Sequence, residues 1–516
     1  MLGLRSWLVW HPLFFAVWPV VSLYQENVAE VPLREAVTAA TAIAAAALVV
    51  LVTLTLLARD ARRASLLTSV LVLAVMLWGA ATDAAGDPRW LLWVWVGGAV
   101  VLCLVVLRVQ SLLRELTQIA AGIAVVVLVL ALVPVIQTKG PILVAARASA
   151  APADGLDARI GDWAAGGKPR DIYYLVLDRY GSQEAMEQRW DADLSPFFDG
   201  LRERGFFVAG DSKANHLRTA QSLASTLNLR YLTDMEQRFG PETNDLLPVY
   251  SLLQDHAVGR LLHDRGYRYV HIGPWWDPTQ SNPHADVNYS YETASDFTVA
   301  LRRSTLISAF ARGPQGRSRI EQARHVPFDG AQQQFADIRR AADGSAPTFT
   351  FAHILLPHEP FVFDRHGNYV SHEQESAWTR ERSYVEQTMY TNDQVTALVD
   401  ELLDVPAEDQ PIIIVAADEG PAPVRFKADD ENFDWTTATA AELEEKLAIL
   451  NTYYLPGTTD SGLYPSISPV NSWRVIFNTY FGADLELLED RSYVFRNEHH
   501  VYDFTEVTDR LGGRIP

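Results

Sequence analysis

Four short stretches of the sequence carry side chains that can hold a metal ion or attack a phosphoryl group. Each stretch sets acids, histidines or a hydroxyl beside an apolar run. The residues that could do this chemistry are Asp178, Thr219, His353 with His358, and the adjacent acids Asp418 and Glu419. Because they lie far apart in the chain, their chemistry depends on elements that bring them together.

Asp418 and Glu419 follow the run Pro411-Ile-Ile-Ile-Val-Ala-Ala417, which is typical of a buried strand. Two neighbouring carboxylates at the end of such a strand repel each other unless a positive group lies between them. Carboxylate oxygens of this kind suit a divalent cation. A solvated turn closed by Gly420 is the alternative interpretation.

Asp178 ends the apolar run 171–177, and Thr219 stands where a helix begins, since Leu223 and Leu227 are one helical turn apart. For both residues the alternative is a role as a helix cap. A hydroxyl at a helix N-terminus and beside a metal can instead lose its proton and attack phosphorus.

His353 and His358 follow a third apolar run and leave it through a proline-braced loop, His353-Ile-Leu-Leu-Pro-His358-Glu-Pro. A single histidine is usually structural, but a pair at a strand exit favours function, because imidazole binds metals and exchanges protons near neutral pH. We expect His358, with His353, to bind a phosphoryl group or to protonate a leaving alcohol.

These residues need a scaffold in which several strands end at one edge. Short, continuous apolar runs separated by helical segments predict a parallel sheet covered on both faces. We expect strands near residues 171–177, 267–272, 348–355, 411–417 and 450–456, and helices over 383–403 and 472–481. Ligands of such sheets bind at the carboxyl ends of the strands. Residues 421–447 are rich in acids, and we expect an exposed insertion there.

Taken in order, the four stretches resemble those of the alkaline phosphatase/sulfatase superfamily. The membrane-anchored branch, with lipoteichoic acid synthases and phosphoethanolamine transferases, is the more similar one. The segments that carry the resemblance are the strand ending in Asp178, Thr219-Ala-Gln-Ser222, His353–Phe361 and Asp418-Glu419-Gly420. The resemblance implies an α/β fold, an alkaline-phosphatase-like domain with a mainly parallel sheet between helices.

The resemblance also implies roles for single residues. Thr219 would be the nucleophile, and His358 would face the substrate. The implied ligands of one divalent metal ion, Mn or Zn with Mg also possible, are Asp178, Thr219, Asp418 and Glu419. Glu419 stands where the family usually has histidine, which makes the site richer in oxygen and favours Mn or Mg. A degenerate site that binds no metal is the alternative.

Sulfatases of this superfamily convert a cysteine or serine in C/S-x-P-x-R to formylglycine. Thr219 lies in no such motif, and the single cysteine, Cys103, lies in an apolar stretch, so phosphorus is favoured over sulfur. The expected function is transfer or hydrolysis of a phosphoryl group, with a phospholipid or lipid-linked donor and an envelope glycan or lipid acceptor. The alternative is a catalytically degenerate envelope scaffold or binding protein. Trp275 and Trp276 are expected either to line a substrate site or to belong to the core.

Five apolar stretches in the N-terminal part are long enough to span a bilayer. They lie near residues 6–24, 36–58, 64–82, 90–107 and 118–137. A transporter is disfavoured, because the last four stretches contain no charged residue. We predict a transmembrane domain over 1–138, a linker over 139–169 and an α/β domain over 170–516.

The loops after the second and fourth stretches are basic, and those after the first and third are acidic. The positive-inside rule then predicts a multi-pass cell-membrane protein with an extracytoplasmic C-terminal domain. The net charge is −20, and residues 1–150 contain ten basic and seven acidic residues, so the remainder carries −23. A domain this acidic would repel nucleic acid.

Overall fold

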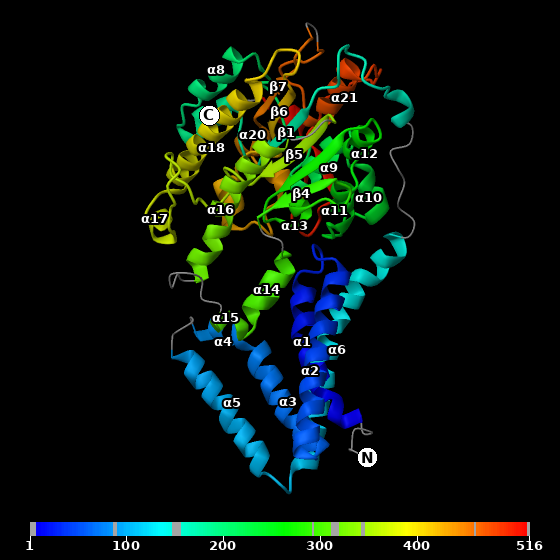
Figure 1. The fold of residues 1–516 in the computed structure, drawn as a ribbon, viewed down its shortest axis with the longest axis vertical. Coiled ribbons are helices and arrows are strands. Elements are labelled where there is room, and N and C mark those ends of the chain that lie inside the picture. The colour runs from blue at the N-terminus through cyan, green and yellow to red at the C-terminus, as the bar shows by residue number, and fades with distance from the viewer. Residues whose placement is uncertain are drawn as a thin grey trace. The chain divides into compact units, whose positions relative to one another are not determined.

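The computed structural model describes residues 7–85, 90–146, 156–291, 294–310, 319–341, 346–458 and 461–512. The chain divides into two compact units, drawn in Figure 1. The first comprises Met1–Ala148 and Ala294–Arg317, and the second Ser149–Thr293 and Ser318–Pro516. Residues 147–155, a part of the predicted linker, lie outside the described residues.

The first unit is built from apolar helices. They are η1 (Trp7–Trp10), α1 (His11–Glu26), α2 (Leu33–Ala58), α3 (Ala61–Met76), α4 (Trp78–Ala85), α5 (Leu91–Arg108) and α6 (Leu113–Ala146). Among the described residues, four helical stretches are long and apolar enough to cross a membrane, and α3 with α4, bent by 48°, is a fifth if the pair counts as one span. The predicted N-terminal apolar helices are therefore confirmed, with a count of four to five.

A segment from the middle of the sequence also belongs to the first unit. It contains α14 (Asp296–Ser304) and α15 (Ile307–Phe310). Phe297 and Leu301 pack in a small core with Tyr24 of α1, and the backbone N–H of Leu306 donates a hydrogen bond to the carbonyl of Val75. No sequence pattern predicted this return of the chain to the N-terminal helices.

The second unit contains a seven-stranded sheet with the order β2-β7-β6-β1-β5-β3-β4. Its strands are β1 (Ile172–Leu177), β2 (Phe207–Val208), β3 (Arg268–Gly273), β4 (Val287–Ser290), β5 (Thr348–Ile354), β6 (Ile412–Ala417) and β7 (Asn451–Tyr454). Of these described strands, β7 alone runs in the direction opposite to all the others. The predicted mainly parallel α/β sheet is therefore confirmed, while β2 and β4 were not predicted. A small separate sheet pairs β8 (Tyr493–Phe495) with β9 (Phe504–Glu506).

Helices cover both faces of the large sheet (Figure 1). One face carries α7 (Gln183–Trp190), α8 (Ser195–Glu203), α16 (Arg319–Arg340), α18 (Arg380–Leu403) and α20 (Ala440–Leu447). The other carries α9 (Thr219–Leu227), α10 (Asp234–Phe239), α11 (Leu247–Gln254), α12 (Ala257–His263) and α21 (Pro469–Tyr480). Leu175 of β1 faces the first set and Tyr174 the second, which explains why the strand sequences are apolar without alternation.

Shorter helices complete the second unit. They are η2 (Asp157–Arg159), α13 (Asp277–Gln280), α17 (His372–Ser376), α19 (Val424–Ala428), η4 (Trp435–Thr437) and η5 (Thr508–Arg510). The exposed insertion expected over 421–447 is wrong, because Phe426 and Trp435 are buried there and pack ring to ring. Within the predicted linker, Trp163 stacks on Tyr480 of the sheet unit.

Candidate metal centre and nucleophile

The sheet register brings three of the predicted residues to one edge. β1 lies between the parallel strands β5 and β6, and its last residue, Leu177, is level with Ala417 of β6. Asp178 and Asp418 each come one residue later, and His353 of β5 is level with the residue two places before Asp178. Because side chains alternate between the faces of a sheet, all three are directed to the face that α9 covers.

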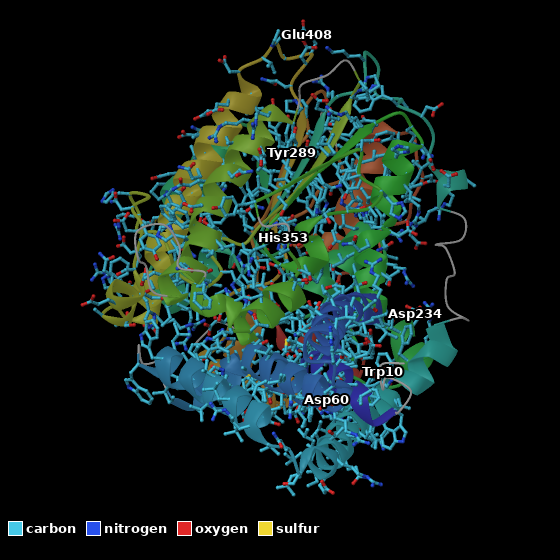
Figure 2. All side chains as sticks on the ribbon, turned by 60° about the horizontal axis from the view of Figure 1, so that its bottom comes forward. Trp10, Asp60, Asp234, Tyr289, His353 and Glu408 are labelled. Atoms are coloured by element: carbon cyan, nitrogen blue, oxygen red, sulfur yellow. The ribbon has the colours of Figure 1, made fainter. Side chains whose placement is uncertain are left out.

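Asp178, His353 and Asp418 form a buried group whose candidate ligand atoms all lie within 4.8 Å of one another. The Nε2 atom of His353, labelled in Figure 2, is 3.4 Å from Oδ2 of Asp178. We call these three residues the open cluster. Asp178 does not cap the following helix, since Ser182 accepts the capping hydrogen bond of α7.

Each member of the open cluster has a buried polar atom with no hydrogen-bond partner in the described part of the chain. These atoms are Oδ1 of Asp178, Nε2 of His353 and Oδ2 of Asp418. Burial, reinforced by the charges of Asp178 and Glu419, holds the pKa of Asp418 well above its ordinary value. Unsatisfied buried acceptors are costly, and two carboxylates with one imidazole are a normal donor set for a divalent metal. The residues present therefore fit such an ion.

Thr219 is the first residue of α9 and lies beside the open cluster. Its hydroxyl donates to Oδ2 of Asp178 over 3.5 Å, and no side chain caps α9 at Arg218. The hydroxyl of Ser222, one turn later, donates to the backbone carbonyl of Asp418 over 2.6 Å. The helix is thus tied to the acidic loop, while Thr219 itself stays partly exposed. The alternative role of Thr219 as a helix cap finds no support in this geometry.

Glu419 has different partners from Asp418. Its Oε1 is 2.6 Å from Nζ of Lys446 and 3.2 Å from Nε of Arg179, and its Oε2 accepts the backbone N–H of Arg218 over 2.9 Å. Burial opposes ionisation, but the charges of Lys446 and Arg179 hold the pKa of Glu419 below its ordinary value. We call Glu419, Lys446 and Arg179 the paired cluster. Both oxygens of this predicted ligand are engaged by the protein.

Gly420 allows Lys446 to reach Glu419. A Cβ atom at Gly420 would lie 2.3 Å from the carbonyl oxygen of Glu445, so only glycine permits this close approach to α20. The backbone N–H of Gly420 donates to the carbonyl of Lys446 over 2.7 Å. Sequence reasoning missed Lys446; the buried Leu443 and Leu447 on the same short helix were the signal that this segment packs inward.

Two arginines with positive φ position the acids. Arg179 has φ 61° and Arg218 has φ 63°, a backbone region that is strained for residues other than glycine. The backbone N–H of Arg179 donates to Oδ1 of Asp418 over 3.0 Å, just as that of Arg218 donates to Glu419. Arg179 therefore follows the candidate ligand Asp178, and Arg218 precedes the candidate nucleophile Thr219. Both direct their backbone N–H groups to the adjacent acids Asp418 and Glu419.

His358 lies near the open cluster but is not a member of it. Its Nδ1–H donates to the carbonyl of Glu359, which leaves Nε2 for other contacts. Burial, with the charge of Arg179, lowers the pKa of His358 to about 3, so the imidazole is neutral. The Glu359 carboxylate pairs with Lys427 and with Nη1 of Arg179, so charges of both signs surround His358.

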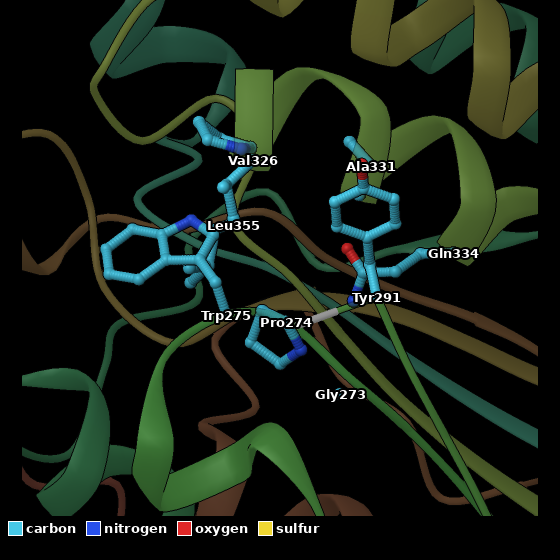
Figure 3. A pocket seen from close by; sticks show the side chains of 10 residues that line it. Gly273, Pro274, Trp275, Tyr291, Val326, Ala331, Gln334 and Leu355 are labelled. Carbon is cyan, nitrogen blue, oxygen red and sulfur yellow. The ribbon is translucent and has the colours of Figure 1, made fainter. Parts of the chain in front are cut away.

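A pocket lies at the carboxyl ends of β3 and β5 (Figure 3). Gln334 of α16, which lines it, donates to the backbone carbonyl of His353 over 2.7 Å. The pocket therefore lies on the α16 side of β5, whereas the His353 side chain is directed to the α9 side. Trp275 lines the pocket, whereas Trp276 packs edge-on against His353, with ring centroids 5.8 Å apart. Trp276 also packs against the core of the sheet unit, and a substrate-lining role for Trp275 stays a prediction. Other lining residues are Pro274, Tyr291 and Leu355.

The chain is similar to one family model and to several solved structures. Residues 170–457 match the family model described as sulfatase. The C-terminal periplasmic domain of EcEptC from Escherichia coli is similar at 12% identity and a TM-score of 0.44, over 68% of this chain and 96% of that one. The soluble domain of lipooligosaccharide phosphoethanolamine transferase A from Neisseria meningitidis is similar at 11% identity and a TM-score of 0.38, over 65% of this chain and 96% of that one.

A protein in the alkaline phosphatase superfamily from Vibrio parahaemolyticus is similar at 13% identity and a TM-score of 0.40, over 72% of this chain and 84% of that one. No curated protein sequence matches the chain. The family match covers more than half of the 516 residues and includes the open cluster and Thr219. This chain therefore belongs to the sulfatase family.

Proposed function

We propose that this protein is a membrane-anchored, metal-dependent enzyme that transfers or hydrolyses the phosphoryl group of lipid-linked or cell-envelope phosphodiesters, with Thr219 as nucleophile. One observation carries the proposal. The Thr219 hydroxyl lies 3.5 Å from Oδ2 of Asp178, which belongs to the buried open cluster. Within the described ranges, each of the three residues of this cluster has a polar atom without a hydrogen-bond partner. Membership of the sulfatase family and the apolar N-terminal helices support it.

The residues that would hold the metal are Asp178, His353 and Asp418, with the hydroxyl of Thr219. Oxygen ligands with one imidazole suit Zn or Mn, and Mg is possible. Such an ion, when bound, lowers the pKa of the hydroxyl and offsets charge on the phosphoryl oxygens. His353 thereby takes the ligand role that the sequence assigned to Glu419, whose pairing with Lys446 and Arg179 weighs against ligation.

The reaction divides into two displacements at phosphorus. Thr219 Oγ forms a bond to phosphorus as the donor alkoxide leaves, which gives a phospho-threonine. The acceptor hydroxyl, or water, then attacks this phosphorus, and the bond to Thr219 Oγ breaks. Overall one proton passes from the acceptor hydroxyl to the donor alcohol. His358, beside Arg179, binds the phosphoryl group or exchanges that proton through Nε2.

The membrane helices favour a phospholipid or lipid-linked donor and an envelope glycan or lipid acceptor. We propose the orientation that the basic loops favour, with the N-terminus in the cytoplasm and the sheet unit outside. A threonine at the helix start, in place of the cysteine or serine of the formylglycine motif, favours phosphorus over sulfur. The charge of −23 after residue 150 does not suit nucleic acid.

Mass spectrometry of the full-length protein in detergent, after incubation with total bacterial phospholipid and Mn²⁺, tests the proposal. The expected result is a phosphorus-containing adduct on the peptide with Thr219. The adduct is absent from Thr219→Ala and present in Ser251→Ala, a control that removes an exposed hydroxyl on α11. An adduct on another residue, or none with any lipid although metal is bound, would contradict the assignment and favour the scaffold function.

A further inference from the structure

We infer that Thr279 is a positioning residue that holds the ring of His353 with Nε2 available to a metal ion. The inference rests on the proposed metal centre and deepens it. Thr279 lies in the short helix α13 and is 2% exposed. Its Oγ1 is 2.7 Å from Nδ1 of His353.

The contact matters because an imidazole nitrogen binds a metal only through a free lone pair. When Nδ1 of His353 donates its proton to the Thr279 hydroxyl, Nε2 carries no proton. Nε2 is the atom that faces Asp178 at 3.4 Å, and it has no hydrogen-bond partner within the described ranges. Outer contacts of this kind fix both the tautomer and the orientation of a histidine ligand.

Thr279 is itself held by a row of buried side chains. At one end the backbone N–H of Gly259 donates to Nδ1 of His256 over 2.9 Å. At the other end Nε2 of His271 is 2.7 Å from the carbonyl of Thr279. The hydroxyl of Tyr269 lies between the two rings, 3.0 Å from His256 Nε2 and 3.1 Å from His271 Nδ1.

The two ends fix the direction of every hydrogen bond in this row. A backbone amide can only donate and a carbonyl can only accept. Hence His256 donates from Nε2 to Tyr269, Tyr269 donates to Nδ1 of His271, and His271 donates from Nε2 to Thr279. Burial lowers the pKa of His256 to about 3 and that of His271 to about 4, so both rings are neutral, as this order requires. A row with every hydrogen bond satisfied holds Thr279 in one place.

Gly273, the last residue of β3, makes the contact sterically possible. A Cβ atom there would lie 2.0 Å from the carbonyl oxygen of Gln280 and 2.4 Å from that of Thr279. Therefore α13 packs against the end of β3 only because Gly273 has no side chain. Since β3 pairs with β5, this packing brings Thr279 onto His353.

Metal titration separates positioning from simple packing. The full-length protein in detergent, freed of metal with a chelator, is titrated with Mn²⁺ and with Zn²⁺ by calorimetry. Thr279→Val keeps the shape but removes the hydroxyl, and we expect about 10- to 100-fold weaker binding. Thr279→Ser keeps the hydroxyl and is expected to bind about as well as the unmodified protein. Thermal unfolding of the metal-free proteins checks the fold.

The outcomes distinguish this inference from the proposed function. If the unmodified protein binds metal and Thr279→Val binds it equally well, Thr279 only packs and the inference is wrong. If the unmodified protein binds neither ion, the proposed metal centre itself fails. Should Thr279→Val not fold, Thr279→Ala against Thr279→Ser makes the same comparison, and equal affinities would again overturn the inference.

Discussion

The open cluster and the paired cluster contain acids that are neighbours in the sequence but have different surroundings. Asp418 lies beside a second carboxylate, whereas Glu419 lies beside two cations. In the open cluster, Asp178 and Asp418 are buried together with His353 and leave polar atoms unsatisfied within the described ranges. In the paired cluster, the buried carboxylate of Glu419 has a lysine at 2.6 Å and an arginine at 3.2 Å. The open cluster could bind a cation from outside the chain, whereas the paired cluster contains its own cations.

The bend that follows β6 directs the two side chains to different partners. Asp418 continues β6 on the face covered by α9, where Thr219 and His353 also lie. Glu419, one residue later, places Oε1 on Lys446 of α20 and Oε2 on the backbone N–H of Arg218. Two carboxylates adjacent in sequence can therefore belong to two different sites. Adjacency alone is weak evidence for shared metal ligation.

Thr219→Ala should have the largest effect on function, since it removes the nucleophile and leaves both clusters intact. We expect turnover of phospholipid to fall by more than about 10⁴-fold, and metal binding to weaken as well, because the Thr219 hydroxyl is one of the proposed ligands. Phosphate-ester turnover and calorimetric metal titration measure the two quantities. Turnover near that of the unmodified protein would show that the open cluster serves a different nucleophile.

Lys446→Met should destabilise the second unit, because it leaves the Glu419 carboxylate buried with one cation fewer. Breaking a buried ion pair costs about 3–5 kcal/mol, whereas replacing both partners is often close to neutral. We therefore expect Glu419→Gln/Lys446→Met to regain most of the lost stability in denaturant unfolding. A double variant less stable than Lys446→Met would mean that Glu419 is stabilised by something other than its cations.

Asp178→Asn should weaken metal binding, since it removes one charged ligand of the open cluster. The loss should exceed about 100-fold, the upper end of the effect of outer contacts. Asp199→Asn, which changes an exposed acid on α8, is the matched control and should bind normally. Calorimetric titration with Mn²⁺ measures both. Equal affinities in the two variants would place the ion elsewhere.

Lys168→Met should have the smallest effect. Lys168 pairs with Asp409 at 2.8 Å, but its side chain is 69% exposed, and exposed ion pairs contribute little to stability. Because the substitution is the same as at Lys446, the two variants compare the stability contributed by an exposed ion pair with that of a buried one. We expect the two unfolding midpoints, of this variant and of the unmodified protein, to agree within error. A loss of stability as large as that in Lys446→Met would show that the buried ion pair contributes no more than the exposed one.

Much of the fold could be predicted from the sequence, because a central strand buried on both faces must be a continuous apolar run. The runs that became β1, β5 and β6 were found for this reason, and the acids or histidine at their ends followed. Strand β2 was missed because it has only two residues, and β4 because its four residues are not a continuous apolar run.

The partners of the site residues could not be predicted. Lys446 lies in a segment whose many acids suggested exposure. The few aromatic residues through which this segment packs, such as Phe426 and Trp435, are too sparse to form a pattern that predicts burial. Thr279 reaches His353 only through the packing that Gly273 permits. These contacts join elements far apart in the chain, and single-sequence patterns do not encode which helix packs on which strand end.

The metal content of two variants tests the central claim most directly. Full-length protein, Asp418→Asn and Glu419→Gln/Lys446→Met are each loaded with Mn²⁺, dialysed and measured by elemental analysis. Binding of the ion by the open cluster predicts about one ion per chain in the unmodified protein and in the double variant, and almost none in Asp418→Asn. An ion retained by Asp418→Asn but lost from the double variant would contradict it and would make Glu419 the ligand.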